Sequence, residues 1–317
     1  MLSQRMITFL TAAWLCLAHF NGIANAKSPA LDEAISRYTA LYQQGRFVEA
    51  LPYATEALRL SEEEFGQDDT TTASYLNDLA NIHKQVGDYA YAEPLYRRAL
   101  AIREKALGPE HPDVAQSLSN LAGLYHDQGN YAEAQPLYQC SLAIWEKSLG
   151  PEHPNVATSL NNLAGLYHDQ GNYAEAQPLY RRAIVIEEKA LGPEHPNVAV
   201  SLNNLAVVYR DLENYNEAEP LYRRALAIME KALGPEHPSV AAPLKGLADI
   251  DLARGDYTRA EPLYQRSLII LERVLGANHR DVAKVLEKYA QLLHKTGRVD
   301  EAVDMEARAK VIRAQYE

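Results

Sequence analysis

Apolar residues along the chain follow a helical spacing that is interrupted and restarted at short intervals. Between residues 151 and 170, apolar residues stand at positions i, i+3, i+4 and i+7 and form a stripe on one side of a helix: Leu160, Leu163, Ala164 and Tyr167. Gly171 interrupts the spacing, a second stripe occupies residues 173–186, and Gly192 follows as a residue suited to the position after a helix end. This stretch predicts two antiparallel helices joined by a tight turn.

The two-helix pattern repeats with a period of 42 residues, and residues 120–138 are identical to residues 162–180. Glycines mark the ends of the second helices at this interval: Gly66, Gly108, Gly150, Gly192, Gly234 and Gly276. A second glycine series marks the turn inside each unit, with Glu213 at the one place where the glycine is missing. The period predicts about seven units, the first and last degenerate, at residues 27–66, 67–108, 109–150, 151–192, 193–234, 235–276 and 277–317. Because neither helix of a unit buries its stripe alone, the units must stack into a solenoid.

Residues of the fourth unit stand at the signature positions of a known repeat: Leu160, Leu163, Ala164, Tyr167, Gly171, Tyr173, Ala176, Tyr180 and Ala183. At these positions the chain resembles the tetratricopeptide repeat, or TPR. The 42-residue period and the Leu-Gly-Pro-Glu-His-Pro connection make it similar to the kinesin light chain type of this repeat. The resemblance implies an all-α fold, a right-handed solenoid of helix-turn-helix repeats whose first helices line a concave surface. It also implies a scaffold that binds a protein or a peptide.

Residues 1–26 differ in composition from the rest of the chain. Arg5 precedes an apolar run over residues 6–20, and residues 24–26, Ala-Asn-Ala, are the small residues of a cleavage site. This pattern predicts a secretory signal peptide and a mature chain that begins at Lys27, with an uncleaved anchor as the alternative. The protein is therefore expected to be periplasmic or secreted.

The charge of the chain limits its partners. The formal net charge is -11 for the whole chain and becomes -12 without residues 1–26, because Arg5 is the one charged residue there. This acidic balance argues against nucleic acid or an anionic membrane surface as the main partner. No later segment approaches the length of an apolar membrane span, so no stable membrane insertion of the mature chain is expected.

Two groups of side chains suggest chemistry at first sight. Histidines recur in the connections between units: His111, His153, His195, His237 and His279. They stand one per unit, so neighbouring histidines should be too far apart to share a metal ion at about 2 Å per bond. Arginine pairs such as Arg97 and Arg98 suggest a phosphate-binding ladder, but the i,i+4 spacing from Glu93 to Arg97 favours a solvated helix face.

No P-loop, HExxH motif or Ser/His/Asp order is present. Nearly every polar residue that could act in catalysis has an equivalent in the next unit, whereas a catalytic site normally occurs once. We therefore predict no enzyme activity, no metal site and no cofactor. An enzyme with an unrecognised site is the alternative.

The face of each first helix opposite its buried stripe is the candidate binding surface. It carries asparagines in the earlier units and lysines in the last two: Asn77, Asn120, Asn161, Asn162, Asn203, Asn204, Lys245, Lys284 and Lys288. An asparagine side chain offers a donor and an acceptor, which suits the backbone of an extended peptide of any sequence. The lysines predict that the partner presents an acidic side chain or a C-terminal carboxylate.

The sequence leaves other interpretations of this face open. The asparagines could be solvated, or could tie neighbouring helices together, and the lysines of the last unit could belong to a solvated cap. The whole chain could also be a structural or self-assembling spacer without a peptide ligand. We favour a non-enzymatic protein-binding or peptide-binding scaffold in an exported compartment.

Overall fold

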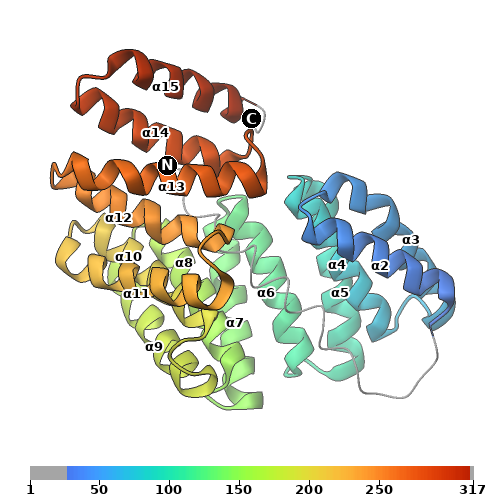
Figure 1. The fold of residues 1–317 in the computed structure, drawn as a ribbon. Helices are drawn as coiled ribbons and strands as arrows, with labels where there is room; N and C mark the ends of the chain where they lie inside the picture. The colour runs from blue at the N-terminus through green and yellow to red at the C-terminus, as the bar shows by residue number, and fades with distance from the viewer. Residues whose placement is uncertain (1–26, 315–317) are drawn as a thin grey trace. The chain divides into compact units, whose positions relative to one another are not determined.

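The computed structural model describes residues 27–314, and this part of the chain consists of helices and contains no strand (Figure 1). The all-α prediction is therefore confirmed. The predicted signal peptide at residues 1–26 lies outside the described residues. None of the helices in the described part is long and apolar enough to span a membrane.

The helices alternate as first and second members of pairs, and a short 3-10 turn precedes α12. Their bounds are α2 (Pro29–Gln43), α3 (Phe47–Phe65), α4 (Thr70–Gln85), α5 (Tyr89–Leu107), α6 (Pro112–Asp127), α7 (Tyr131–Leu149), α8 (Pro154–Asp169), α9 (Tyr173–Leu191), α10 (Pro196–Asp211), α11 (Tyr215–Leu233), η1 (Pro238–Val240), α12 (Ala241–Ala253), α13 (Tyr257–Leu275), α14 (Arg280–Lys295) and α15 (Val299–Arg313).

Equivalent helices begin 42 residues apart, as the period predicts: α6, α8 and α10 at Pro112, Pro154 and Pro196. A proline suits the first helical position because the N–H that it lacks would have no partner within the helix. The second helices also contain a proline, and α9 continues through Pro178 over 19 residues. Tertiary packing of the long helix therefore outweighs the local cost of the proline.

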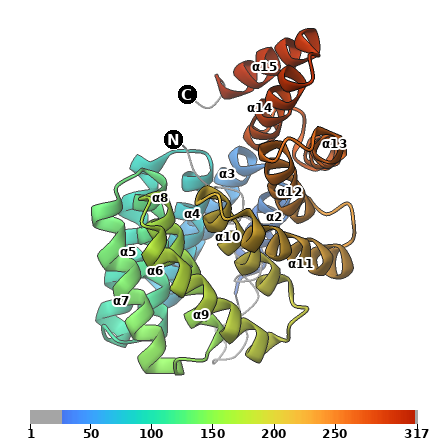
Figure 2. The ribbon, with the colours of Figure 1, turned by 90° about the vertical axis from the view of Figure 1, so that its left-hand side faces the viewer.

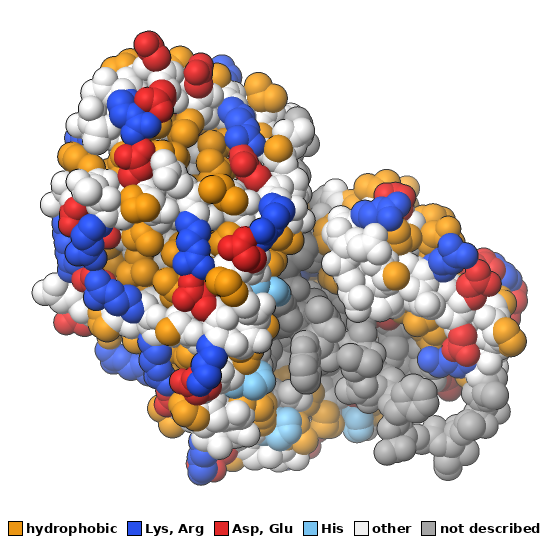
Figure 3. All heavy atoms as spheres, in the orientation of Figure 1, with side chains coloured by type: hydrophobic (Ala, Val, Ile, Leu, Met, Phe, Trp, Pro, Cys, Tyr) orange, Lys and Arg blue, Asp and Glu red, His pale blue; other side chains and the backbone are white. Residues whose placement is uncertain are grey.

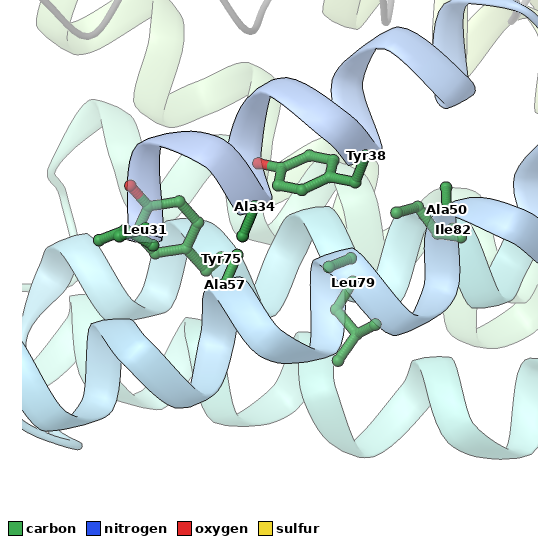
Figure 4. Close-up of a cluster of buried hydrophobic side chains, with 9 residues drawn as sticks. Leu31, Ala34, Tyr38, Ala50, Ala57, Tyr75, Leu79 and Ile82 are labelled. Atoms are coloured by element: carbon green, nitrogen blue, oxygen red, sulfur yellow. The ribbon is translucent and has the colours of Figure 1, made fainter. Parts of the chain in front are cut away.

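The chain divides at Gly171 into two compact units, whose described residues are 27–170 and 171–314. The unit 27–170 contains α2–α8, and each of these helices packs against the next. Figure 4 shows the cluster where α2, α3 and α4 meet, with Leu31, Tyr38 and Leu79 among its buried side chains. Burying one such large apolar side chain contributes about 1.5–3 kcal/mol to folding.

The unit 171–314 contains α9–α15, and Figure 2 shows α12 to α15 following one another as two helix pairs. Tyr222 and Tyr264 are fully buried in its core. The equivalent position of α15 carries Glu306, which is exposed and lies 3.0 Å from the His294 ring nitrogen Nε2. A polar residue at this position suits a terminal helix that faces solvent.

The turn between α10 and α11 contains Glu213, the residue that replaces glycine in the repeated pattern. Glu213 has a φ of 59°, whereas Gly171, 42 residues earlier, has a φ of 78°. A side chain at positive φ costs about 1–2 kcal/mol relative to the ordinary helical region. The repeat therefore keeps its turn geometry at this point at a local cost in stability.

Candidate functional site

The first helices present a polar, half-buried face, as the sequence pattern predicts. In α8 this face includes Thr158, Asn161, Asn162 and Asp169, all of intermediate exposure, while Leu160 and Leu163 on the other side are buried. In the unit 27–170 the equivalent positions of α4 and α6 carry Asn77, Asn81, Gln116 and Asn120. The face is therefore rich in amide groups, which can both donate and accept hydrogen bonds.

Several of these polar side chains connect neighbouring first helices within residues 27–170. The Asn162 amide donates to the Ser119 hydroxyl at 3.3 Å, and the Lys84 ammonium lies 3.4 Å from the Asp127 carboxylate. His126 lies 2.8 Å from the Asp169 carboxylate. These contacts favour a structural role for part of the face, which is one of the alternatives left open by the sequence.

The asparagines of this unit differ in their surroundings. Asn120 accepts a 2.9 Å hydrogen bond from the Gln116 amide and is half-buried. Asn77 is only 5% exposed, and neither atom of its amide has a hydrogen-bond partner in the described part of the chain. Buried polar atoms are nearly always paired, so Asn77 requires an explanation.

In the unit 171–314, Asn203 and Asn204 are more buried than a position on a groove surface would suggest. Their side chains are 3% and 8% exposed, and the Oδ1 atom of each accepts no hydrogen bond from any described residue. Both therefore keep an unused acceptor. Ligand binding by these asparagines stays a prediction.

The predicted lysines of this unit have three different environments. Lys245 lies 2.7 Å from the Asp249 carboxylate, and Lys284 lies 2.7 Å from the Asp281 carboxylate. Lys288 is half-buried and has no carboxylate within ion-pair distance among residues 27–314. Of the three lysines, Lys288 is therefore the one whose charge is not already paired.

Asp249 is the centre of a charged network beside Lys245. It also lies 3.1 Å from the Arg210 guanidinium and accepts a 2.7 Å hydrogen bond from the Tyr264 hydroxyl. Burial acts to raise the pKa of Asp249, but Lys245 and Arg210 outweigh burial and hold the pKa below its ordinary value. Burial lowers the pKa of Lys245, and the positive charges of Arg210 and Lys288 act in the same direction.

The five connection histidines cap helices, a role that sequence reasoning missed. In each, Nδ1 accepts a hydrogen bond from the backbone N–H two residues later, at 3.1 to 3.3 Å: His111, His153, His195, His237 and His279. An N-cap acceptor satisfies one of the unpaired N–H groups at the start of a helix. Within the described residues no group of three His, Cys, Asp or Glu side chains could hold a metal ion.

The arginines of the second helices form ion pairs, in agreement with a solvated face. Arg97 lies 2.8 Å from Glu93 on its own helix, and Arg98 lies 2.6 Å from Glu62 of the preceding second helix. Figure 3 shows basic and acidic side chains next to one another on the displayed face of the molecule. Such exposed pairs contribute about 0–1 kcal/mol each.

Sequence reasoning also missed Arg103, which lies within a stripe of α5 and is 5% exposed. The equivalent positions of later units carry the buried apolar residues Trp145, Met229 and Leu271, and the buried charged residue Glu187. A charged residue within a stripe that is expected to be buried is the signal that could have identified Arg103.

Helix pairs that repeat every 42 residues and pack against one another define a helical repeat protein. The sequence model of the tetratricopeptide repeat matches residues 39–105, 71–138, 113–189, 156–231, 197–268 and 239–312. The chain belongs to the tetratricopeptide repeat family. No curated protein matches its sequence.

Solved structures support this assignment and the resemblance to kinesin light chains. BtubC (BKLC) from P. vanneervenii is 26% identical with a TM-score of 0.58, and the match covers 78% of this chain and 94% of BtubC. The nearly identical TPR-like repeats of a putative kinesin light chain from Podosopora anserina are 32% identical with a TM-score of 0.54, over 65% of this chain and 97% of that one. A Rap protein complexed with Competence and Sporulation Factor has a TM-score of 0.70 over 93% of this chain and 77% of its own, and its 16% identity shows a shared fold.

Proposed function

We propose that this chain is a non-enzymatic scaffold that binds an extended peptide or protein segment along the polar face of its first helices. The observation that carries the proposal is the set of buried amides with unused groups on this face, namely Asn77, Asn203 and Asn204. The backbone of an extended peptide has one N–H and one C=O per residue, so it can satisfy such amides without a particular sequence. Asn77 lies on α4 in the second repeat, and Asn203 and Asn204 lie on α10 in the fifth.

A more specific proposal concerns the end of the partner that lies over the unit 171–314. Lys288 has no acidic partner in the described chain, and Lys245 shares Asp249 with Arg210. An acidic side chain or a C-terminal carboxylate of the ligand would supply the missing negative charge through charge-assisted hydrogen bonds. Lys284 is less suited, because Asp281 already occupies it.

The test begins with a pull-down of the mature protein from its own compartment and identification of the protein that co-purifies. The affinity of that partner is then measured by calorimetry for Lys288→Ala and for Lys310→Ala, an exposed lysine of α15 that serves as the charge-matched control. We expect Lys288→Ala to weaken binding by about 1–3 kcal/mol and Lys310→Ala to leave it unchanged. Equal affinities for both variants, with unchanged helix content, would reject the acidic-group proposal.

We also propose that the protein is exported, on the strength of the signal-peptide pattern in residues 1–26. A tagged full-length chain should be recovered outside the cytoplasm with Lys27 near its mature N-terminus. An intact Met1 on a cytosolic protein would contradict this.

A structural spacer is the second candidate function, and the contacts between first helices favour it. If Asn162 and His126 serve only to join α6 and α8, no ligand will compete for them. Light scattering of the mature protein tests the self-assembling form of this spacer, whose mass would grow with protein concentration. The pull-down tests the other form, because a spacer without a ligand retains no partner.

A further inference from the structure

Each end of the described chain has a helix face that no further repeat covers. Between inner repeats, the second helix of one repeat packs against the first helix of the next, as α5 does against α6. Among residues 27–314, no first helix follows α15 and no second helix precedes α2, and Figure 1 shows α15 at the edge of the unit 171–314. The contact between inner repeats would continue at these two end faces.

Hydrogen bonds between inner repeats show which positions meet across such a contact. Arg103 of α5 donates to the Ser117 hydroxyl of α6 at 3.0 Å. Two repeats later, Glu187 of α9 accepts a 2.6 Å bond from the Ser201 hydroxyl of α10. In both pairs the first-helix residue follows the second-helix residue by 14 positions. The register of the contact is therefore the same in both places.

The two ends of the chain carry opposite charges at these positions. The period of 42 residues places Arg313 of α15 at the position of Arg103, and Glu33 of α2 at the position of Ser117. Both side chains are exposed, Arg313 by 55% and Glu33 by 69%. If the inner register continues between two copies of the chain, Arg313 of one copy meets Glu33 of the other.

A second pair of positions in the same contact changes from polar to apolar at both ends. Glu93 of α5 accepts a 3.0 Å hydrogen bond from the Tyr125 hydroxyl of α6. The same positions carry Val303 on α15 and Leu41 on α2. Val303 is 51% exposed, and Leu41 is half-buried. The end faces therefore match each other in apolar character as well as in charge.

The face of α15 is also hollowed where a first helix would lie. A hollow of about 380 Å³ is lined by residues of α14 and α15, among them Ala309, Lys310 and Arg313. Ala309 stands at the position of Ser141 in α7, whose hydroxyl lies 3.4 Å from the Ser159 hydroxyl of α8. The hollow is therefore on the side that the next first helix occupies in an inner repeat.

We propose that copies of this chain associate end to end, with α2 of one copy packed against α15 of the next. Arg313 forms an ion pair with Glu33 of the neighbouring copy, and Val303 packs against its Leu41. The contact joins two different faces, so each copy has one of each to offer and the mass grows beyond a dimer.

This contact is weaker than the contact between inner repeats. Glu306 of α15 stands at the position of the buried Tyr96, and Arg37 of α2 stands at the position of the buried Leu121. Charged residues at these positions keep the ends soluble and remove apolar area that an inner contact buries. The association is therefore reversible and depends on protein concentration.

The end faces are distinct from the polar face of the first helices. Glu33 has the position of Ser117, whereas the amides of the polar face have the positions of Gln116 and Asn120. A ligand on the polar face and a neighbouring copy can therefore bind at once. The proposal goes beyond the scaffold function and does not depend on it.

Sedimentation of the mature protein at concentrations up to its solubility limit measures the association. We expect the average mass to rise with concentration and to rise less at high salt, which screens ion pairs. Glu33→Arg and Arg313→Glu each place like charges opposite one another and should weaken association about tenfold. The two changes in one chain restore opposite charges and should restore association. The control Glu104→Arg alters an exposed residue of α5 by the same charge and should have no effect.

A further pair of variants tests the apolar part of the contact. Val303→Asp should weaken association several-fold, because a charge would then face Leu41 of the neighbouring copy. Val185→Asp is the matched control, since Val185 is an exposed valine of α9 outside both end faces. It should leave association unchanged.

The double charge exchange separates an interface from a structural effect. Arg313 pairs with Glu287 on its own chain, so its loss could loosen α15. A change at residue 33 does not repair that pair, and recovery in the double variant therefore requires contact between copies. A monomer at every concentration, a double variant as weak as the single ones, or a dimer unaffected by Glu33→Arg would each overturn the proposal. None of these results bears on the scaffold function, which the pull-down tests.

Discussion

Acid is expected to destabilise the unit 171–314 through its histidine caps. His195 and His237 each accept a backbone hydrogen bond at Nδ1, at 3.1 and 3.3 Å, so each ring must be neutral at this nitrogen. Protonation converts the acceptor into a donor and adds a positive charge at a helix N-terminus, where the helix dipole is also positive. Both effects oppose the cap.

The direction of the pH dependence follows from the pKa of each ring. Burial lowers the pKa of His195 and of His237 below the ordinary value of 6.5, which applies to the unfolded chain. The unfolded chain therefore binds more protons than the folded chain in the range just below pH 6.5. The contribution of both caps is fully present above pH 6.5 and is lost as the pH falls from 6.5 through the lower folded pKa values.

The size of the effect follows from the two capping bonds. A lost N-cap costs about 1 kcal/mol, so both together cost about 2 kcal/mol. The two caps bond different backbone groups, the N–H of Asn197 and the N–H of Ser239, and should act independently. For a unit of this size, about 2 kcal/mol lowers Tm by about 4–8 °C.

Thermal unfolding followed by circular dichroism at pH 7.5 and pH 5.0 measures this effect. The control is the double variant His195→Asn and His237→Asn, because asparagine caps a helix and does not titrate. Carboxylates titrate alike in both proteins, so the difference between the two pH responses isolates the caps. A variant whose Tm falls with pH as steeply as that of the parent would refute the capping argument.

Two further substitutions test local packing and backbone conformation. Gly246→Ala should lower the free energy of unfolding by about 1–3 kcal/mol, because the added Cβ would lie 2.4 Å from ring carbons of Tyr222. Gly123→Ala is the control, because its Cβ would lie 3.1 Å from the movable end of the Lys84 side chain. A urea titration of each variant measures the difference, and Gly123→Ala should be tolerated. Glu213→Gly should raise the free energy of unfolding by up to about 1 kcal/mol, because glycine adopts a φ of 59° without strain. The reverse change at the equivalent turn, Gly171→Glu, should lower the free energy of unfolding. A loss of stability in Glu213→Gly would contradict this account.

The helical period predicted most of the fold because every repeat uses the same local signals. Pro112 and its equivalents begin helices, and the apolar stripe around Leu160 is buried as the spacing requires. The role of His195 could not be read from the period, because a cap depends on the backbone angles of the connection. The contacts of Arg103 could not be predicted either. The helical spacing predicts that residue 103 is buried, but it does not predict where the charged end of the long side chain lies.

The candidate site was less predictable because equivalent positions do not have equivalent neighbours. Asn204 has the sequence position of Asn162, yet Asn162 is half-buried and bonded to Ser119, while Asn204 is buried with an unused acceptor. A repeated pattern identifies which face a residue is on. It does not identify the side chain that the next repeat places against it.

Tyr222 shows how one substitution changes the partners of a repeated residue. In the equivalent positions, the Tyr96 hydroxyl donates to Asn81 and the Tyr264 hydroxyl donates to Asp249 at 2.7 Å. The partner position of Tyr222 carries Val207, and the buried Tyr222 hydroxyl has no partner among the described residues.

Restoring the polar partner should therefore stabilise the unit 171–314. Val207→Asn places an acceptor where the repeats of Tyr96 and Tyr264 have one. A satisfied buried hydroxyl should raise the free energy of unfolding by about 1 kcal/mol in a urea titration. The matched control is Tyr222→Phe, which removes the hydroxyl and leaves the ring. In the Tyr222→Phe background Val207→Asn should lose its benefit and become destabilising, because the new amide would then be buried without a donor. A gain of the same size in both backgrounds would show that the Tyr222 hydroxyl does not limit stability at this position.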